Sequence, residues 1–239
     1  MKKTFLAVAL STAMVAPAIS AVELKTDEQK VSYSVGLMVG EQLKTIPDLD
    51  FDAFYEAVQT TYKGNEAQLN PEQVREVMEA FQKKQMEAQK QKFDKLSADN
   101  LEKGKKYLAD NGKKSGVKTT ESGLQYEELT AGKGEMPTVQ DTVKVHYRGT
   151  LINGTEFDSS YSRNEPVSFP LNGVIPGWTE GLQLIKEGGK ARLVIPSDLA
   201  YGPGGMGNAI GPNETLIFEV ELLEINPGES QEAAKAEAK

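Results

Sequence analysis

Few side chains in this sequence could carry nucleophilic or metal chemistry. The chain of 239 residues contains one histidine, His146, and no cysteine. A thiol nucleophile, a histidine-rich zinc site and a Ser-His-Asp triad each need His or Cys in quantity or in a matched position. His146 lies in VKVHYRG, a strand-like alternation, so we interpret it as structural and keep a catalytic base as the alternative. These counts argue against covalent and zinc chemistry.

A second group of candidate residues is aromatic or aliphatic and lies beside expected turns and strand ends. Trp178, the only tryptophan, follows a Pro-Gly pair in GVIPGWTEGL. Taken singly, each member could be a core residue, and Trp178 is no exception. Together they have the composition of a small apolar pocket with a few orienting hydroxyl groups. The set is Tyr147, Phe157, Phe169, Val174, Ile175, Trp178, Tyr201, Ile210 and Phe218.

A glycine-rich segment at residues 202–207, GPGGMG, formally matches the dinucleotide pattern GxGxxG. That pattern binds a pyrophosphate only where a strand precedes it and a helix follows it. Here the following residues, NAIGPNETLIF, read as a turn and then a strand. We therefore interpret the segment as a hairpin loop and expect no cofactor and no metal.

The elements that must position these residues begin near residue 117, where the pattern changes to strands and turns. Apolar residues alternate at 143–147, and Asn153-Gly154 is a strong hairpin signal. Residues 190–196 and 215–225 read as further strands. Between them, Trp178, Leu182 and Ile185 have helical spacing and predict one short helix. We expect an α+β fold, a curled antiparallel sheet around one short helix.

Residues 22–112 are expected to be entirely helical. Thr26 and Gln29 form a capping box, a second short helix follows, and Asn70-Pro71 can begin a third helix that runs over residues 71–111. Such a helix is about 60 Å long. Its middle, residues 82–92, has almost no apolar face, which is typical of a solvated spacer between domains.

The first helix contains small residues at intervals of four: Ser32, Gly36 and Gly40. A glycine inside a helix costs about 1 kcal/mol relative to alanine, so close approach of another helix is a plausible compensation. The helices of residues 22–112 also make a thin core for a monomer. We therefore expect a homodimer with these three residues in its interface; the alternative is that the glycines fit packing within one chain.

Both ends of the sequence differ from the rest. Residues 1–21 have a lysine pair, an apolar run and then small residues, which is typical of a bacterial secretory signal peptide and implies a periplasmic protein. Cleavage would change the net charge from −8 to about −10, which argues against nucleic acid and anionic lipid as partners. We expect residues 113–119 to be a linker and residues 227–239 a disordered tail.

Five segments, in this order and spacing, resemble the FK506-binding-protein class of peptidyl-prolyl cis/trans isomerases: VHYRGTL, FDSSYSR, VIPGWTEGL, LVIPSDLAYG and TLIFEVELLEI. The resemblance covers residues 120–226. The helical first half is also similar to the dimerisation region of the Mip/FkpA group of exported bacterial members. The resemblance implies a proline-binding pocket between the curled sheet and its helix.

The resemblance also implies roles for individual residues. Trp178 would form the pocket floor, and the Ile175 N–H and the Tyr201 hydroxyl would hold carbonyls of a peptide or of an FK506- or rapamycin-type macrolide. Asp158 would accept hydrogen bonds from Tyr147 and Arg163, although spacing alone suggests a surface ion pair. The implied catalytic residues are Tyr147, Phe157, Asp158, Trp178, Tyr201 and Phe218, and the implied substrate-binding residues are Arg163, Val167, Phe169, Val174, Ile175, Met206 and Ile210.

The sequence departs from the family pattern at the edge of the expected pocket. Val167 stands where many members have phenylalanine, Met206 where a histidine is common, and Ala209 where one of two isoleucines is usual. The floor is retained while the rim is altered. The preference for the residue before proline and the macrolide affinity are therefore open.

Three functional hypotheses follow. The first is a periplasmic peptidyl-prolyl isomerase that acts on unfolded or proline-containing exported proteins, in which the apolar pocket favours the twisted amide without covalent chemistry. The second is a chaperone whose dimeric cleft binds unfolded clients, with isomerase activity secondary. The third is a binding module whose pocket is inactive.

Overall fold

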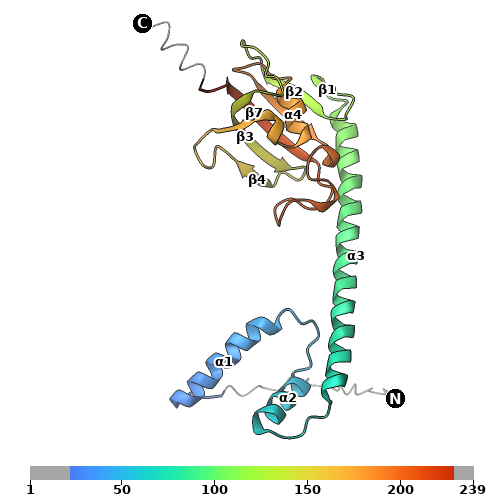
Figure 1. Cartoon of the computed structure of the whole chain (residues 1–239), viewed down its shortest axis with the longest axis vertical. Coiled ribbons are helices and arrows are strands. Elements are labelled where there is room, and N and C mark those ends of the chain that lie inside the picture. The colour runs from blue at the N-terminus through green and yellow to red at the C-terminus, as the bar shows by residue number, and fades with distance from the viewer. Residues whose placement is uncertain (1–21, 229–239) are drawn as a thin grey trace, which may run out of the picture. The chain divides into compact units, whose positions relative to one another are not determined.

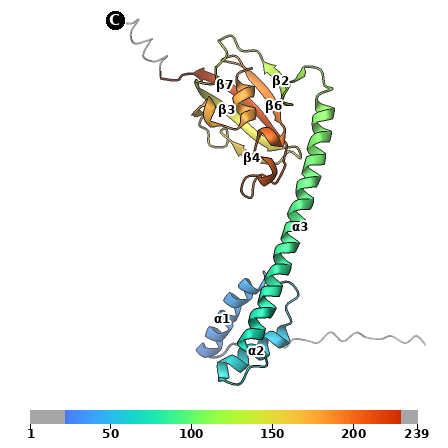
Figure 2. The ribbon, with the colours of Figure 1, turned by 45° about the vertical axis from the view of Figure 1, so that its right-hand side comes forward.

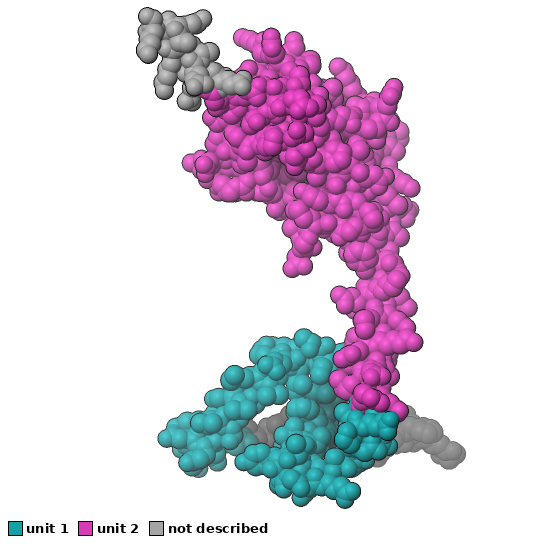
Figure 3. All heavy atoms as spheres, in the orientation of Figure 1, with its two compact units in different colours: residues 1–74 teal, residues 75–239 magenta. Residues whose placement is uncertain are grey.

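The computed structural model describes residues 22–228, so the expected signal peptide and residues 229–239 of the expected tail lie outside the described residues. The chain divides into two compact units, residues 1–74 and residues 75–239 (Figure 3).

The first unit contains two short helices, α1 (Asp27–Leu43) and α2 (Phe51–Lys63) (Figure 1). The predicted capping box is present: the Gln29 N–H donates to Thr26 Oγ1 at 3.3 Å, and the Thr26 N–H donates to Gln29 Oε1 at 3.1 Å. Asp50 caps α2 by accepting from two backbone N–H groups. Neither helix contains a buried residue. The apolar faces of both helices are therefore exposed in the single chain.

Helix α3 (Pro71–Asn111) begins as predicted, with the Gln73 N–H donating to Asn70 Oδ1 at 2.9 Å. Its last turns lie beside the sheet in two views (Figures 1 and 2). The apolar residues Phe93 and Leu96 remain 44% and 47% exposed. The buried residues of α3 are instead Asn100, Gly104 and Asn111, which are polar or small.

The second unit contains a seven-stranded sheet with antiparallel pairing throughout. The order is β1-β2-β6-β7-β3-β4, and β5 also pairs with β3. The strands are β1 (Val117–Thr119), β2 (Gln125–Thr130), β3 (Thr142–Leu151), β4 (Glu156–Ser159), β5 (Val167–Pro170), β6 (Lys190–Ile195) and β7 (Leu216–Ile225). The last three residues of the expected linker thus pair with β2 as β1. The α+β class is confirmed.

One helix, α4 (Pro176–Leu182), packs on the concave side of the sheet. Alternate residues of β3 and β7 face this helix and are buried, as period-two strands require. Leu182 and Ile185, predicted as core residues, are 0% and 2% exposed. Because Gly181 of α4 faces Leu193 of β6, the helix approaches the sheet closely at this point.

This close approach predicts a stability effect. A Cβ atom at position 181 would lie 2.6 Å from Leu193 Cδ1, which is too close for two carbon atoms. We expect Gly181→Val to lower the free energy of unfolding by about 1–3 kcal/mol, because it overpacks a filled core. Urea unfolding of the full chain measures this loss. Gly204→Val is the matched control, since nothing lies within 4 Å of its Cβ position; equal effects of the two substitutions would contradict the prediction.

Candidate active site

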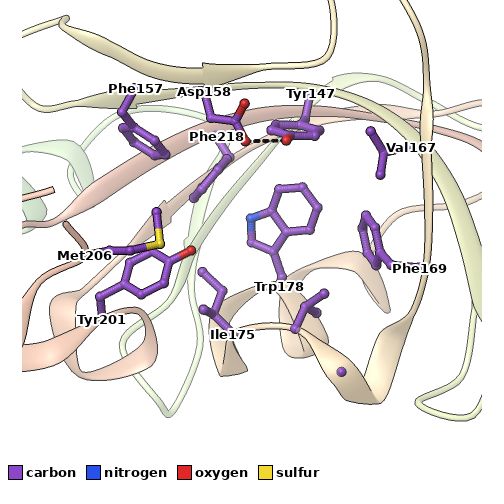
Figure 4. A pocket seen from close by; sticks show the side chains of 12 residues that line it. Tyr147, Phe157, Asp158, Val167, Phe169, Ile175, Trp178, Tyr201, Met206 and Phe218 are labelled. Atoms are coloured by element: carbon purple, nitrogen blue, oxygen red, sulfur yellow. Dashed lines mark hydrogen bonds between the residues drawn. The ribbon is translucent and has the colours of Figure 1, made fainter. Parts of the chain in front are cut away.

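A cavity of about 410 Å³ opens between α4, the sheet and two connecting loops (Figure 4). This volume suits a small ligand. All the catalytic and substrate-binding residues expected from the sequence line this cavity except Arg163 and Ile210. The lining consists of Tyr147, Phe157, Asp158, Val167, Phe169, Gly173, Val174, Ile175, Trp178, Tyr201, Met206 and Phe218.

Trp178 forms the floor of the cavity and lies in the first turn of α4, which begins at Pro176. Pro176 occupies the first helical position, where its fixed φ and missing N–H cost nothing, and Trp178 follows within the first turn, 6% exposed. Its indole packs edge-on against Tyr147 and Phe218, with ring centroids 5.1 Å and 5.0 Å away. Phe169 packs at 5.2 Å. Four aromatic rings therefore fix the base of the cavity.

The Trp178 Nε1–H is buried and has no hydrogen-bond acceptor among the described residues. The nitrogen side of the indole is turned toward Phe218 (Figure 4), and the two ring planes stand at 84°. This arrangement directs the N–H at the face of an aromatic ring, a weak but recurrent interaction. The floor thus offers a nearly apolar surface to a ligand.

A polar network lies at one edge of the cavity. The Tyr147 hydroxyl, on β3, donates to Asp158 Oδ2, on β4. Arg163 Nη1 donates to Asp158 Oδ1 at 2.6 Å, and Arg163 Nη2 donates to the Tyr147 oxygen at 2.9 Å. The contact is therefore a three-residue network rather than a simple surface ion pair. Arg163 itself does not line the cavity; it binds the two residues that do.

Burial and these contacts change the pKa values of Asp158, Tyr147 and Tyr201. Burial acts to raise the pKa of Asp158, but the hydrogen bonds from Tyr147 and Arg163 outweigh it and lower the pKa below 3.8. Burial, with the hydrogen bond to Asp158, raises the pKa of Tyr147 above 10.0. Burial and the charge of Asp158 raise the pKa of Tyr201 in the same way. At neutral pH the carboxylate is ionised and both phenols are protonated.

A flat pH profile follows from these directions. The Asp158 network is present above the ordinary carboxyl pKa and is lost only as the pH falls through the lowered pKa of the folded state. For the isomerisation that the family resemblance implies, we expect the catalytic efficiency (kcat/KM) to stay constant from about pH 5 to pH 9. The measurement is the rate with one proline peptide across this range. A bell-shaped profile would contradict it and favour a catalytic base such as His146.

Two polar groups at the cavity are available to a ligand. Tyr201 directs its hydroxyl into the cavity (Figure 4). Ile175, which precedes α4 as its N-cap residue, lies between Tyr201 and Trp178 (Figure 4). Neither the Tyr201 hydroxyl nor the Ile175 N–H forms a hydrogen bond within residues 22–228. Both can therefore donate to a carbonyl oxygen.

One expected site residue needs correction, and one lining residue was not predicted. Ile210, expected to bind substrate, is 2% exposed and does not line the cavity; its N–H and C=O pair with Met206, so it supports the lining residue from behind. Gly173 lines the cavity but was not expected. It has no side chain that a composition argument could detect, and only its position beside Val174 would have suggested it.

Within residues 22–228, no group of three or more His, Cys, Asp or Glu side chains is placed to hold a metal ion. No helix in the same range is sufficiently long and apolar to span a bilayer.

The second unit thus has a cavity with an aromatic floor between one short helix and an antiparallel sheet. Comparison with known proteins identifies the family. Residues 133–223 match the family model for FKBP-type peptidyl-prolyl cis-trans isomerase, and residues 28–127 match the domain amino-terminal to it. The chain belongs to the FKBP-type peptidyl-prolyl cis-trans isomerases and catalyses that isomerisation.

Its relatives match along most of their length. The chain is 43% identical to the FKBP-type peptidyl-prolyl cis-trans isomerase FkpA of Escherichia coli K12, with 100% of this chain and 93% of that protein covered. It is 42% identical to the outer membrane protein MIP of Legionella longbeachae, with 91% and 93% covered. The crystal structure of E. coli FkpA superposes with a TM-score of 0.75 at 44% identity, covering 85% of this chain and 99% of that one.

Proposed function

We propose that the cavity above Trp178 is where this isomerase binds and rotates the X–Pro bond. The observation that supports the proposal is the combination of an apolar aromatic floor with two unpaired donors at its edge. The prolyl ring would lie on the indole of Trp178. The Ile175 N–H and the Tyr201 hydroxyl would donate to carbonyl oxygens of the peptide on either side of the ring.

Rotation about an X–Pro bond is slow because amide resonance must be broken, with a barrier of about 18–20 kcal/mol. The twisted transition state has lost this resonance, so its carbonyl is less polar than that of the planar amide. An apolar pocket that excludes water therefore stabilises the transition state relative to the ground state. A thousandfold acceleration needs only about 4 kcal/mol of such differential stabilisation.

The Asp158 network would orient the substrate without transferring a proton. Asp158 stays ionised and Tyr147 stays protonated at neutral pH. The hydrogen bond between them lowers the pKa of Asp158 and raises the pKa of Tyr147. Their role in this proposal is to fix one wall of the cavity and to place a negative charge beside the substrate. The decisive test replaces Trp178 and Asp158 together in the full chain and measures the isomerisation rate of a proline peptide.

We also propose that the first unit forms a homodimer. Large apolar side chains on α1 and α2 remain exposed in the single chain: Val31, Val35 and Met38 are 54–70% exposed, and Phe51, Tyr55 and Tyr62 are 64–92% exposed. Among the described residues, no heavy atom other than those of the neighbouring residues and the surrounding helix backbone lies within 4 Å of the Cβ positions of Gly36 and Gly40. Packing within one chain therefore does not account for these glycines, and a second copy of the helix would.

The remaining parts of the proposed function concern location and clients. Residues 1–21 have the composition of a signal peptide, which supports export to a bacterial periplasm. There the enzyme would act on proline-containing exported proteins and would bind macrolides of the FK506 type as inhibitors. A chaperone role for the helical half is favoured by its exposed apolar residues, the same feature that supports the dimer.

A further inference from the structure

The end of α3 contacts the chain close to the pocket. Asn213 Nδ2 donates to Ser97 Oγ at 2.7 Å, and Asn100 Nδ2 donates to the Pro212 carbonyl oxygen at 2.9 Å. One turn further along, Gly104 lies against the side chain of Thr215. We call Ser97, Asn100 and Gly104 the α3 contact face.

This contact is buried and leaves little freedom. Asn100 is 5% exposed and Thr215 is 3% exposed. A Cβ atom at position 104 would collide with Thr215 Oγ1 and would lie 3.3 Å from Thr215 Cβ. The helix backbone therefore lies directly against the Thr215 side chain, and a residue larger than glycine at position 104 requires Thr215 or the helix to shift.

Pro212 and Asn213 form one end of the loop at the edge of the cavity, and Thr215 follows two residues after Asn213. We call residues 202–213 the rim loop. The Asn213 N–H donates to the Gly202 carbonyl at 2.9 Å, which closes the two ends of the rim loop on each other. Within it, the Met206 N–H donates to the Ile210 carbonyl at 2.8 Å, and the Ile210 N–H donates back at 3.2 Å. A shift of Pro212 and Asn213 would thus be transmitted to Gly202 and Met206.

Met206, within the rim loop, and Tyr201, directly before it, both line the cavity. Met206 lines the cavity and is 43% exposed at its mouth, while Tyr201, which directly precedes the rim loop, directs its hydroxyl inward (Figure 4). In the proposed binding mode the prolyl ring would lie on Trp178, and the rest of the peptide would leave across the edge of the cavity. Because Tyr201 and Met206 line the cavity beside and within the rim loop, a shift of this loop would change the edge while leaving the floor in place.

We propose that Asn100 and Gly104 are positioning residues which hold the rim loop against α3 and so set the preference for the residue before proline. The inference rests on the proposed binding of the prolyl ring above Trp178. A sequence segment that reads as a solvated spacer thereby becomes part of what determines substrate choice.

The test uses full-length Asn100→Ala and Gly104→Ala and two peptides that differ only in the residue before proline, leucine in one and glutamate in the other. We expect the ratio of the two kcat/KM values to change by about threefold or more in both variants, because small displacements at a binding site alter rates strongly. A loss of folded protein would lower both values equally and leave the ratio unchanged. The ratio therefore separates positioning from stability.

Two further variants complete the experiment. Lys105→Ala replaces an exposed residue on the same turn and is expected to keep the wild-type ratio. Thr215→Ala introduced into Gly104→Ala removes the colliding oxygen and should return the ratio toward wild type. An unchanged ratio in both Asn100→Ala and Gly104→Ala would overturn the inference. It would leave the pocket assignment intact, since that fails only if the Trp178 and Asp158 substitutions spare activity.

Discussion

A full-length chain carrying Trp178→Leu and Asp158→Val is expected to lose about 100-fold or more of its kcat/KM for a proline peptide. Leucine covers less of the floor than indole and leaves the faces of Tyr147 and Phe218 uncovered, so water enters the cavity. Valine removes the acceptor that holds the Tyr147 hydroxyl and Arg163. A hundredfold loss corresponds to about 2.7 kcal/mol of transition-state stabilisation.

The control for this variant is Trp178→Phe, which keeps an aromatic floor and should retain most of the activity. Because Trp178 is the only tryptophan, circular dichroism rather than fluorescence must establish that each variant is folded. Full activity in the folded double variant would contradict the proposal that this cavity is the catalytic site. If Trp178→Phe also loses activity, the loss of activity in the double variant would come from the shape of the floor and not from its aromatic character alone.

The same double variant separates the isomerase and chaperone hypotheses. If it still suppresses the aggregation of an unfolded client protein, the helical half binds clients independently of the pocket. If suppression is lost together with isomerase activity, the chaperone proposal has no separate support.

The second large effect concerns the oligomeric state. Sedimentation equilibrium of the mature chain is expected to give twice the monomer mass, whereas Gly36→Leu with Gly40→Leu should give the monomer. In a single chain, a Cβ atom at these positions meets no other segment, and leucine favours the helix over glycine by up to about 1 kcal/mol per residue. A loss of the dimer would therefore come from blocked approach of the second copy, not from a weaker helix.

The matched control introduces leucine at an exposed position of the long helix, Gln89→Leu, and should leave the dimer unchanged. A wild-type chain that sediments as a monomer would contradict the proposal directly. A double leucine variant that remains a dimer would show that the two glycines lie outside the interface.

Much of the sheet could be predicted because burial in it follows simple periods. The alternation in Val143, Val145 and Tyr147 predicts β3, and the spacing of Trp178, Leu182 and Ile185 predicts the buried side of the segment that contains α4. The pocket lining followed from residue types near turns together with family resemblance. In these regions local pattern and tertiary environment agree.

The contact face of α3 could not be predicted in the same way. Asn100 and Gly104 read as polar and small residues on a solvated helix, and nothing local shows that Asn100 meets a carbonyl more than a hundred positions later. Ile210 shows the opposite difference between the sequence pattern and the structure. Its apolar character suggested a wall of the cavity, but its backbone pairing with Met206 turns its side chain into the core. Backbone pairing of this kind leaves no trace in composition.

The order of strands in the sheet has a consequence for how the chain acquires its structure. Strand β7, the last in sequence, lies between β6 and β3, and β3 pairs with it across about seventy intervening residues. Until β7 is available, β3 and β6 each lack the neighbour that joins them. The strands β1, β2 and β6 are then separate from β3, β4 and β5. During synthesis the catalytic half therefore cannot fold progressively from its amino-terminal end; it must fold once the last strand has emerged.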